Sequence, residues 1–468
     1  FSEVENFELD LENFVFSGNG PSGIILSYLL NGNLPYYNGS PHPDAMLTAR
    51  LQSATSPSLI EQDLEFLSQG LEGRSNNPVS LLMDSLMHPS ADLGLEYPSV
   101  VKFEHSPDSS VDHVVIGKGA PGGIWQDMKK NLLTISLSSW MDLPGLTFQE
   151  WSSKNLNMKE PVKRVKKMKL CKYFKNHCTV TSVKRLKCSE SFCLICIISN
   201  YFLFQCGQMV VSDEGLWLVS GFSNATHEPF RYITPRVVLA TGTADVPNKL
   251  NVPGEPLYSW IKHDLASFEF DLNRKSKGKA TVDPVLVVGS GLSAADAILL
   301  LRRLNAPIIH VFNQSSTSVL KSLSKSIYPD YQQVSYLLIL FFTVSPYHQI
   351  LDFTSRNNHH YVQIASPDGK VLRKKISSAV ILIGSLSSIF SPLVLLQCLI
   401  LQVTSNEPID CRKNPLNLNP WTHKVVNAPP ALYALGPLAG DNFVRFLLGG
   451  AVAVLCHIHD ESKRQAVR

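Results

Sequence analysis

The chain contains 468 residues, 44% of them hydrophobic and 17% charged, which is the composition of a globular protein and excludes an intrinsically disordered one. The formal net charge of +3 gives no reason to expect a nucleic-acid partner, and the nine cysteines follow no regular framework, which favours a reducing compartment over secretion. The length predicts two or three domains, and because the sequence opens at Phe1 without a signal-peptide pattern, we expect a fragment or an incomplete gene model.

The first element in chain order is a short apolar strand at residues 14–16, followed by the glycine-rich turn Gly18-Asn19-Gly20-Pro21-Ser22-Gly23 and an apolar helix. In a dinucleotide-binding turn the first glycine permits the bend, the second lets the backbone approach a pyrophosphate, and the third lets the helix pack close to the strand. The pyrophosphate then lies at the helix N-terminus, where free N–H groups and the helix dipole favour negative charge. An ordinary strand-to-helix loop is the alternative interpretation.

Residues 31–112 form a long insertion rich in Pro, Ser and Asn, with helical stretches at 59–70 and 81–87. A strand follows at 114–116 and leads into a glycine-rich loop that contains Gly122, Gly123 and Trp125. This loop resembles a further dinucleotide turn, but Pro121 and the paired glycines break the helical pattern. We therefore predict the second strand of the first βαβ unit here, followed by a loop.

A second turn, Gly289-Ser290-Gly291-Leu292-Ser293-Ala294, follows an apolar strand at 285–288 and precedes an apolar helix. Two such turns in strand–turn–helix context imply two dinucleotides in one polypeptide, and the usual chemical reason is a flavin that accepts hydride from a nicotinamide. We predict an α/β fold with two Rossmann-like dinucleotide-binding domains. The candidate residues of the two turns are Gly18, Gly20, Ser22, Gly23, Gly289, Ser290, Gly291 and Ala294.

Further strand ends complete both modules. The strand at 237–240 ends at Thr241 and Gly242, and the second module continues with strands at 308–312 and 379–385. Near the C-terminus an apolar strand meets Gly440-Asp441-Asn442 and a helix at 444–455, which completes the first module from a distance. The nicotinamide domain is therefore inserted in the flavin domain. We expect residues 14–243, including the insertion at 31–112, and 425–468 to form the FAD domain, and 244–390 the NADP domain.

These blocks together resemble the flavin-containing monooxygenases, which use the Gly122-Gly123-Ile124-Trp125, Ala240-Thr241-Gly242 and Gly440-Asp441 steps in this order. Residues 18–30, 68–75, 283–286 and 436–446 resemble more specifically the oxidative stress-induced growth inhibitor family, a monooxygenase-like branch with the same long insertion. The resemblance implies FAD in the first module and NADPH in the second, and an oxygenation of an unidentified small-molecule or protein substrate. It also implies roles in growth regulation, cell death and late cell division.

The sequence departs from the monooxygenase pattern at several positions. Gly117 and Lys118 stand where an acidic residue would hold the FAD ribose, and Ser136 takes the place of an asparagine after the Gly-Gly-x-Trp step. The monooxygenase fingerprint, a Phe-x-Gly step with a later histidine, survives only as Trp260-Ile261-Lys262-His263. Asn313 and Gln314 replace arginines for the 2′-phosphate, so we expect a weak NADPH preference. Residues 172–206 and 386–403 match nothing in the family. A catalytically weak regulatory protein that acts through protein partners is therefore the alternative function.

Each remaining candidate has a plain structural alternative. By the resemblance, Asp441 binds the ribityl chain beside Gly440 and Asn442; otherwise it caps a helix. Trp125 lies against the adenosine side of the flavin, or in the core. Ser136 and His263 are the candidate catalytic residues, and a surface histidine is the alternative for His263. We expect no metal, because the one C-x-x-C step lies in an apolar run, and no transmembrane span, because each apolar run is shorter than the ~20 residues that a bilayer requires. We expect a cytoplasmic location; the midbody is an alternative, and the basic run at 163–169 makes the nucleus another.

Overall fold

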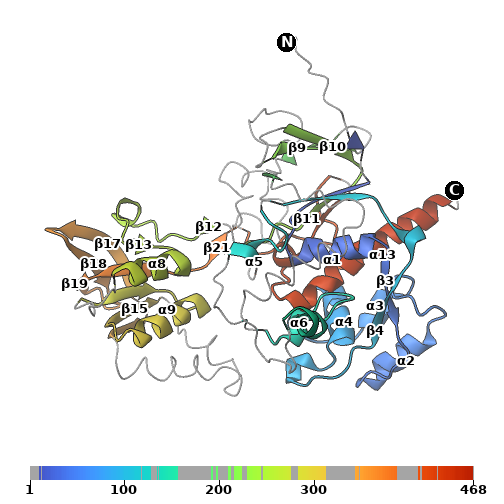
Figure 1. The fold of residues 1–468 in the computed structure, drawn as a ribbon, viewed down its shortest axis with the longest axis horizontal. Coiled ribbons are helices and arrows are strands. Elements are labelled where there is room, and N and C mark those ends of the chain that lie inside the picture. The colour runs from blue at the N-terminus through green and yellow to red at the C-terminus, as the bar shows by residue number, and fades with distance from the viewer. Residues whose placement is uncertain are drawn as a thin grey trace, which may run out of the picture. The chain divides into compact units, whose positions relative to one another are not determined.

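The computed structural model describes residues 10–11, 13–117, 119–127, 134, 136–156, 191–192, 197–198, 209–211, 216–223, 229–243, 246–275, 283–312, 343–346, 348–386, 409–411, 414–429 and 431–466. The chain forms two compact units, drawn in Figure 1. Unit 1 comprises Phe1–Thr243 with Ser387–Arg468, and unit 2 comprises Ala244–Leu386.

A parallel sheet forms the centre of unit 1. Its described strands are ordered β22-β11-β2-β5, and every neighbouring pair is parallel. The strands are β2 (Phe14–Ser17), β5 (His113–Ile116), β11 (Val237–Leu239) and β22 (Leu432–Ala434). Segments from both ends of the chain therefore share one sheet, which confirms the predicted fold class. The long helices α1 (Pro21–Leu30) and α13 (Leu447–Ala466) lie side by side on it (Figure 1).

Both faces of this sheet are buried, which explains why its strands are almost entirely apolar. Phe14, Phe16 and Val115 point to a core that they share with α1, α13 and the insertion helices. Val15 and Val114 point to the opposite core, which is completed by a layer with both parallel and antiparallel strand pairs. That layer consists of β1 (Asp10–Leu11), β6 (Ser191–Phe192), β7 (Ile197–Ile198), β8 (Met209–Val211), β9 (Trp217–Ser223) and β10 (Pro229–Thr234).

The insertion folds against α1 and α13 and contains more regular structure than its composition predicts. The predicted helix at 59–70 is shorter, and the one at 81–87 begins three residues earlier. An antiparallel pair of strands and a further helix were missed, because Pro and Asn depress strand propensity and Asp44 gives only a local capping signal. The elements are β3 (Asn33–Tyr37), α2 (Ala45–Ser53), α3 (Leu64–Ser68), α4 (Pro78–Met87), η1 (Ala91–Leu93), β4 (Val101–His105) and η2 (Pro107–Ser109).

The loop after β5 contains one short helical turn, where the sequence predicted loop only. Because this turn, α5 (Ile124–Asp127), starts after Gly123, the paired glycines still lie outside it. It is followed by η3 (Ser139–Met141) and α6 (Phe148–Leu156). At the other end of the unit, η6 (Gly436–Ala439) and η7 (Val444–Phe446) precede α13, which begins three residues later than expected and runs further.

Unit 2 contains a second parallel sheet with the described order β13-β20-β14-β15-β16. Helix α9 (Leu292–Arg303) follows the central strand β14 directly, as predicted. A three-stranded antiparallel meander packs its apolar side against this sheet through Ile350, Phe353 and Val362. The elements are β12 (Val246–Pro247), η4 (Glu255–Leu257), β13 (Ile261–Lys262), α8 (Leu265–Lys275), β14 (Val285–Val288), β15 (Ile308–Phe312), β16 (Thr343–Pro346), β17 (Gln349–Arg356), β18 (His359–Ala365), β19 (Val371–Ile376), β20 (Ser378–Ile381) and β21 (Ser385–Leu386).

None of the helices in the described residues is both long and apolar enough to cross a membrane. The apolar runs at 192–206, 336–344 and 389–403 lie almost wholly outside the described residues.

Candidate functional site

The two glycine turns have the same backbone conformation, although they lie in different units. Gly18 and Gly289 both have φ +125°, in the region that favours glycine. Gly20 and Gly291 are the N-caps of α1 and α9, with φ/ψ of −76°/−176° and −82°/−178°. Each turn therefore joins a buried central strand to the N-terminus of a helix in the same way.

The first and third positions of these turns are held by packing. A Cβ atom on Gly18 would lie 2.1 Å from the carbonyl oxygen of Ala240, and one on Gly289 would lie 2.2 Å from that of Leu382. A Cβ on Gly23 would lie 1.9 Å from the carbonyl oxygen of Gly18. The second module has the buried Ala294 at the matching third position. These residues are small because strand, turn and helix approach one another closely.

The second glycine of each turn faces open space instead. A Cβ on Gly20 or Gly291 would meet no atom within 4 Å among the described residues. Because both N-caps are glycines, no N-cap side chain occupies the N–H groups of the first helical turn. Backbone donors, a helix dipole and free volume are what a dinucleotide pyrophosphate requires, so the residues of both turns fit such a group.

The carboxyl edge of the unit 1 sheet gathers most of the other candidates. Gly123, with φ +58°, lies so close to the turn that its Cβ would be 2.9 Å from Gly20 Cα. The buried Ser22 Oγ would lie 2.3 Å from a Cβ on Gly436. The Thr241 hydroxyl is buried and has no hydrogen-bond partner in the described part of the chain. It is therefore a free polar group at this edge. Trp125 is half-buried against the core shared with α1.

Three further candidate glycines have backbone conformations that favour glycine. Gly122 and Gly440 adopt φ of +107° and +87°, and Gly242 has φ +69°. Asn442 is exposed, and its amide donates to the carbonyl oxygens of Cys411 and Gly440, each at 2.9 Å. Ser290 is half-buried in the second turn.

The carboxylate of Asp441 is engaged inside unit 1. It accepts hydrogen bonds from Ser75 Oγ at 2.5 Å, Asn77 Nδ2 at 2.9 Å and Ser80 Oγ at 2.7 Å. Asp441 is 1% exposed, and burial raises its pKa against the lowering effect of His423 and these three donors. The role of Asp441 toward the ribityl chain stays a prediction. The carboxylate contacts seen here tie the insertion to the C-terminal segment.

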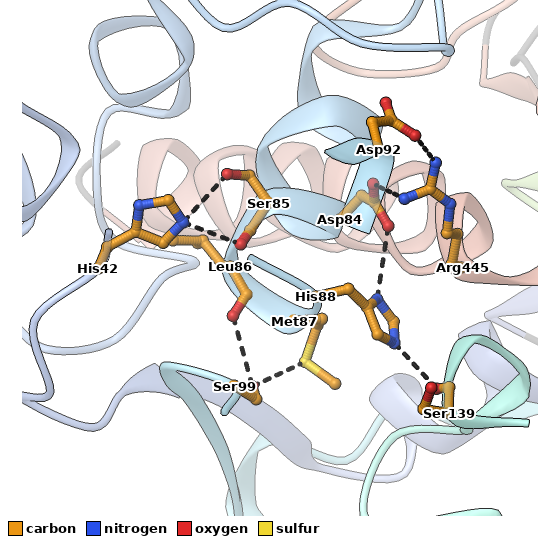
Figure 2. A network of polar contacts seen from close by, with 10 residues as sticks. All are labelled: His42, Asp84, Ser85, Leu86, Met87, His88, Asp92, Ser99, Ser139 and Arg445. Atoms are coloured by element: carbon orange, nitrogen blue, oxygen red, sulfur yellow. Dashed lines mark hydrogen bonds and ion pairs between the residues drawn. The ribbon is translucent and has the colours of Figure 1, made fainter. Parts of the chain in front are cut away.

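A second polar network joins the same two segments (Figure 2). Buried Arg445 donates to Asp84 Oδ2 at 2.9 Å and is ion-paired with Asp92. His88 Nδ1 lies 3.4 Å from Asp84 Oδ1, and its Nε2 lies 3.2 Å from the Ser139 carbonyl oxygen. Burial raises the pKa of Asp84, although His88 and Arg445 oppose this shift. The network holds the insertion, η3 and the segment before α13 together.

In unit 2, two histidines hold loops at the sheet edge. His263 Nε2 lies 2.8 Å from Glu255 Oε1, and the His263 side chain is 18% exposed. Glu255 also accepts from the backbone N–H groups of Leu250 and Val252; burial opposes its ionisation, but these partners lower its pKa. The buried His310 Nε2 lies 2.6 Å from the carbonyl oxygen of Gly289, and burial lowers the pKa of this imidazole.

The remaining candidates are described only in part. Ser136 is buried in unit 1, and its carbonyl oxygen accepts from Thr134 Oγ1 at 2.7 Å. Lys118, Asn313 and Gln314 lie outside the described residues, as do the basic run at 163–169 and the C-x-x-C step. Sequence reasoning missed the roles of Asn19, Ser75, Asn77, Ser80, Glu255 and His310; only Asn77-Pro78, a typical helix start, carried a local signal.

The fold and the paired turns give this chain the two-unit architecture of FAD- and NADP-dependent flavoproteins. Among solved structures, the chain is similar to the bacillithiol disulfide reductase of Bacillus cereus, with a TM-score of 0.58 and 15% identity over 97% of this chain and 100% of that one. It is also similar to the FAD-bound cadaverine monooxygenase DfoA of Erwinia amylovora, with a TM-score of 0.55 and 10% identity over 96% and 95% of the two chains. At these identities the likeness establishes the fold alone.

Curated relatives identify the family. The chain is 39% identical over 473 residues to human oxidative stress-induced growth inhibitor 2, covering 94% of this chain and 92% of the relative. It is 36% identical over 480 residues to mouse oxidative stress-induced growth inhibitor 1, covering 96% of both. The chain belongs to the oxidative stress-induced growth inhibitor family, as the sequence resemblance predicted. No family model matches it.

Proposed function

We propose that this chain is an FAD-binding oxidoreductase that accepts hydride from NADPH and oxygenates a small-molecule or protein substrate. The observation that carries the proposal is the repeated glycine turn. Gly18 and Gly289 share φ +125°, and Gly20 and Gly291 both face open space. Two dinucleotide sites in one polypeptide are the requirement for passing hydride from a nicotinamide to a flavin.

We assign one cofactor to each of the two units. Residues 14–243 with 425–468 would hold FAD, and residues 244–390 would hold NADPH. In the first unit, the N-terminus of α1 and the adjacent Gly123 would receive the FAD pyrophosphate, while Thr241 offers a free hydroxyl at the same edge. In the second, the N-terminus of α9 would receive the NADPH pyrophosphate. A bound flavin would supply hydride acceptance and oxygen activation.

Ser136 in unit 1 and His263 in unit 2 are the proposed catalytic residues. His263 is fixed by Glu255, whose other hydrogen bonds hold the backbone of residues 250–252. Ser136 lies in the buried loop that precedes η3. Relatives are named growth inhibitors, so we place this activity in growth regulation, with cell death and late cell division as the settings and a cytoplasmic, midbody or nuclear location.

A second candidate function is a flavin-fold regulatory protein with little turnover. One observation favours it: the Asp441 carboxylate already accepts from Ser75, Asn77 and Ser80, so three of its roughly four acceptor positions are taken by the protein. In this case the insertion and the C-terminal segment would act together as one rigid surface for protein partners.

The absorption spectrum of the purified full chain separates the two candidates. The oxidoreductase requires a flavin band that NADPH bleaches under nitrogen and that returns when air is admitted. A stable flavin band that NADPH leaves unchanged supports the regulatory protein. A protein that takes up no FAD at any concentration would sink the oxidoreductase proposal.

A further inference from the structure

Asn19 lies inside the first glycine turn and is fixed by the loop that follows β5. Its side-chain Nδ2 donates to the Gly119 carbonyl oxygen at 2.5 Å, and its own carbonyl oxygen accepts from the Gly122 N–H at 2.9 Å. Only 3% of Asn19 is exposed. The turn and the loop are therefore joined through this one residue, by its backbone and its side chain.

The amide of Asn19 fills the space beside the end of β5. A Cβ atom on Gly117, the residue after β5, would lie 2.0 Å from Asn19 Nδ2 and 2.1 Å from its Cγ. Two residues further on, a Cβ on Gly119 would meet nothing within 4 Å in the described part of the chain. A side chain at position 117 therefore requires the Asn19 amide to move, whereas one at position 119 does not.

This position matters because of what dinucleotide folds place there. The residue at the end of the second strand is ordinarily Asp or Glu, and its carboxylate accepts hydrogen bonds from the adenosine ribose hydroxyls. Here the residue is glycine, and a carboxamide takes the place of the acidic side chain. Since Nδ2 faces a carbonyl oxygen, the orientation of the amide is set, and Oδ1 is the remaining acceptor. No described residue donates a hydrogen bond to Oδ1.

We propose that Asn19 is the ribose-binding residue of the FAD site, with Oδ1 accepting a hydrogen bond from the 2′- or 3′-hydroxyl of the adenosine ribose. The inference rests on the proposed FAD binding and names the residue that replaces the missing acid. A neutral amide is a weaker acceptor than a carboxylate, because charge-assisted hydrogen bonds are roughly twice as strong as neutral ones. The chain should therefore hold FAD less tightly than the acidic arrangement would.

The first experiment compares Asn19→Leu with the unmutated full chain, using FAD and an FAD analogue with 2′,3′-dideoxyadenosine. Loss of one neutral hydrogen bond should weaken FAD binding about threefold to tenfold. Affinity for the dideoxy analogue should be the same in both proteins, because it has no hydroxyl to lose. Dissociation constants from flavin fluorescence give the result without any turnover. A loss of equal size for both ligands would mean that Asn19 acts only by shaping the turn.

The second experiment tests whether the amide at position 19 stands in for an acidic side chain at position 117. Gly117→Glu should weaken FAD binding more than tenfold, because Asn19 blocks the new side chain, and adding Asn19→Gly should restore binding to the unmutated level or better. Gly117→Ala against Gly119→Ala is the matched pair, and only the former should weaken binding. Equal FAD affinity across all these variants would overturn this inference alone. An unmutated chain that binds no FAD would overturn the proposed function together with it.

Discussion

Ser80 donates its hydroxyl hydrogen to Asp441 Oδ2 at 2.7 Å, and this contact places the Asp441 carboxylate at the N-terminal turn of α4. Asn77, the N-cap of this helix, makes no capping bond of its own and donates to the same oxygen. Because helix N-termini favour negative charge, this is a favourable position for a carboxylate that comes from the far end of the chain. The Gly-Asp step and the insertion are thus one structural unit.

Asp441→Ala should therefore destabilise the protein strongly. It leaves Ser75, Asn77 and Ser80 buried or half-buried without their acceptor, and hydrogen bonds to a charged group are worth about 1.5–3 kcal/mol each, so we expect a loss of about 3–5 kcal/mol in the free energy of unfolding. Urea unfolding monitored by tryptophan fluorescence measures it. Exposed Asp460→Ala on α13 is the control, with a change below about 0.5 kcal/mol. Equal midpoints for the two variants would show that these three hydrogen bonds do not stabilise the protein.

The glycines of the first turn should separate folding from cofactor binding. Gly20→Val adds a side chain in open space at an allowed φ, so the fold should persist while the path of the pyrophosphate is blocked and FAD is lost. Gly23→Ala places Cβ 1.9 Å from the Gly18 carbonyl oxygen and should lower the melting temperature itself. Flavin content after gel filtration and thermal melting are the two readouts. Stoichiometric FAD in Gly20→Val would show that the first turn holds no dinucleotide.

Sequence reasoning succeeded where one short segment carries the whole signal. The turn at Gly18, the turn at Gly289 and their flanking strands were located from local pattern, because the strand period, the glycines and the helix start agree within about ten residues. It failed in the insertion, where α2 and the antiparallel pair β3 and β4 have weak local propensity and contribute residues to the core that contains α1 and α13. The partners of Asp441 and Gly117 were beyond its reach, since a close approach between distant residues leaves no mark on either segment.

The free energy of unfolding should fall as pH rises toward neutrality, because the Asp142 carboxyl is protonated in the folded chain. Burial raises the pKa of this carboxyl from 3.8 to about 7 in the folded chain, while the bond from the Phe148 N–H and nearby His88 oppose the shift. Between these two values the folded state binds a proton that the unfolded state has released. The stabilising contribution is therefore complete below about pH 4 and is lost by about pH 7, at up to ~1.4 kcal/mol per pH unit.

Asp142→Asn is the matched variant for this pH dependence, because its side-chain oxygen can still accept from Phe148 at the same position. Its free energy of unfolding should be less dependent on pH between 4 and 7 than that of the unmutated chain. The difference between the two proteins isolates Asp142 from half-buried His113 and buried His310, because burial lowers the pKa values of these histidines and their contribution to stability rises with pH. Parallel curves for the two proteins would show that Asp142 titrates normally.

The pair of Arg445 and Asp84 should behave as a buried ion pair, in contrast to surface pairs of the same chain. Arg445→Met leaves the Asp84 carboxylate buried without its guanidinium partner and with only His88 nearby, so we expect a loss of about 3–5 kcal/mol in the free energy of unfolding. The double variant Arg445→Met/Asp84→Leu removes both charges and should recover much of this loss, since apolar replacement of a buried pair is often neutral. Lys102→Ala, which breaks an exposed pair with Glu104, should cost less than about 1 kcal/mol. Urea unfolding of the four proteins completes the comparison. If the double variant is as unstable as Arg445→Met, then Arg445 stabilises the protein through its contacts with Asp92 and the Trp140 and Phe446 rings rather than through Asp84.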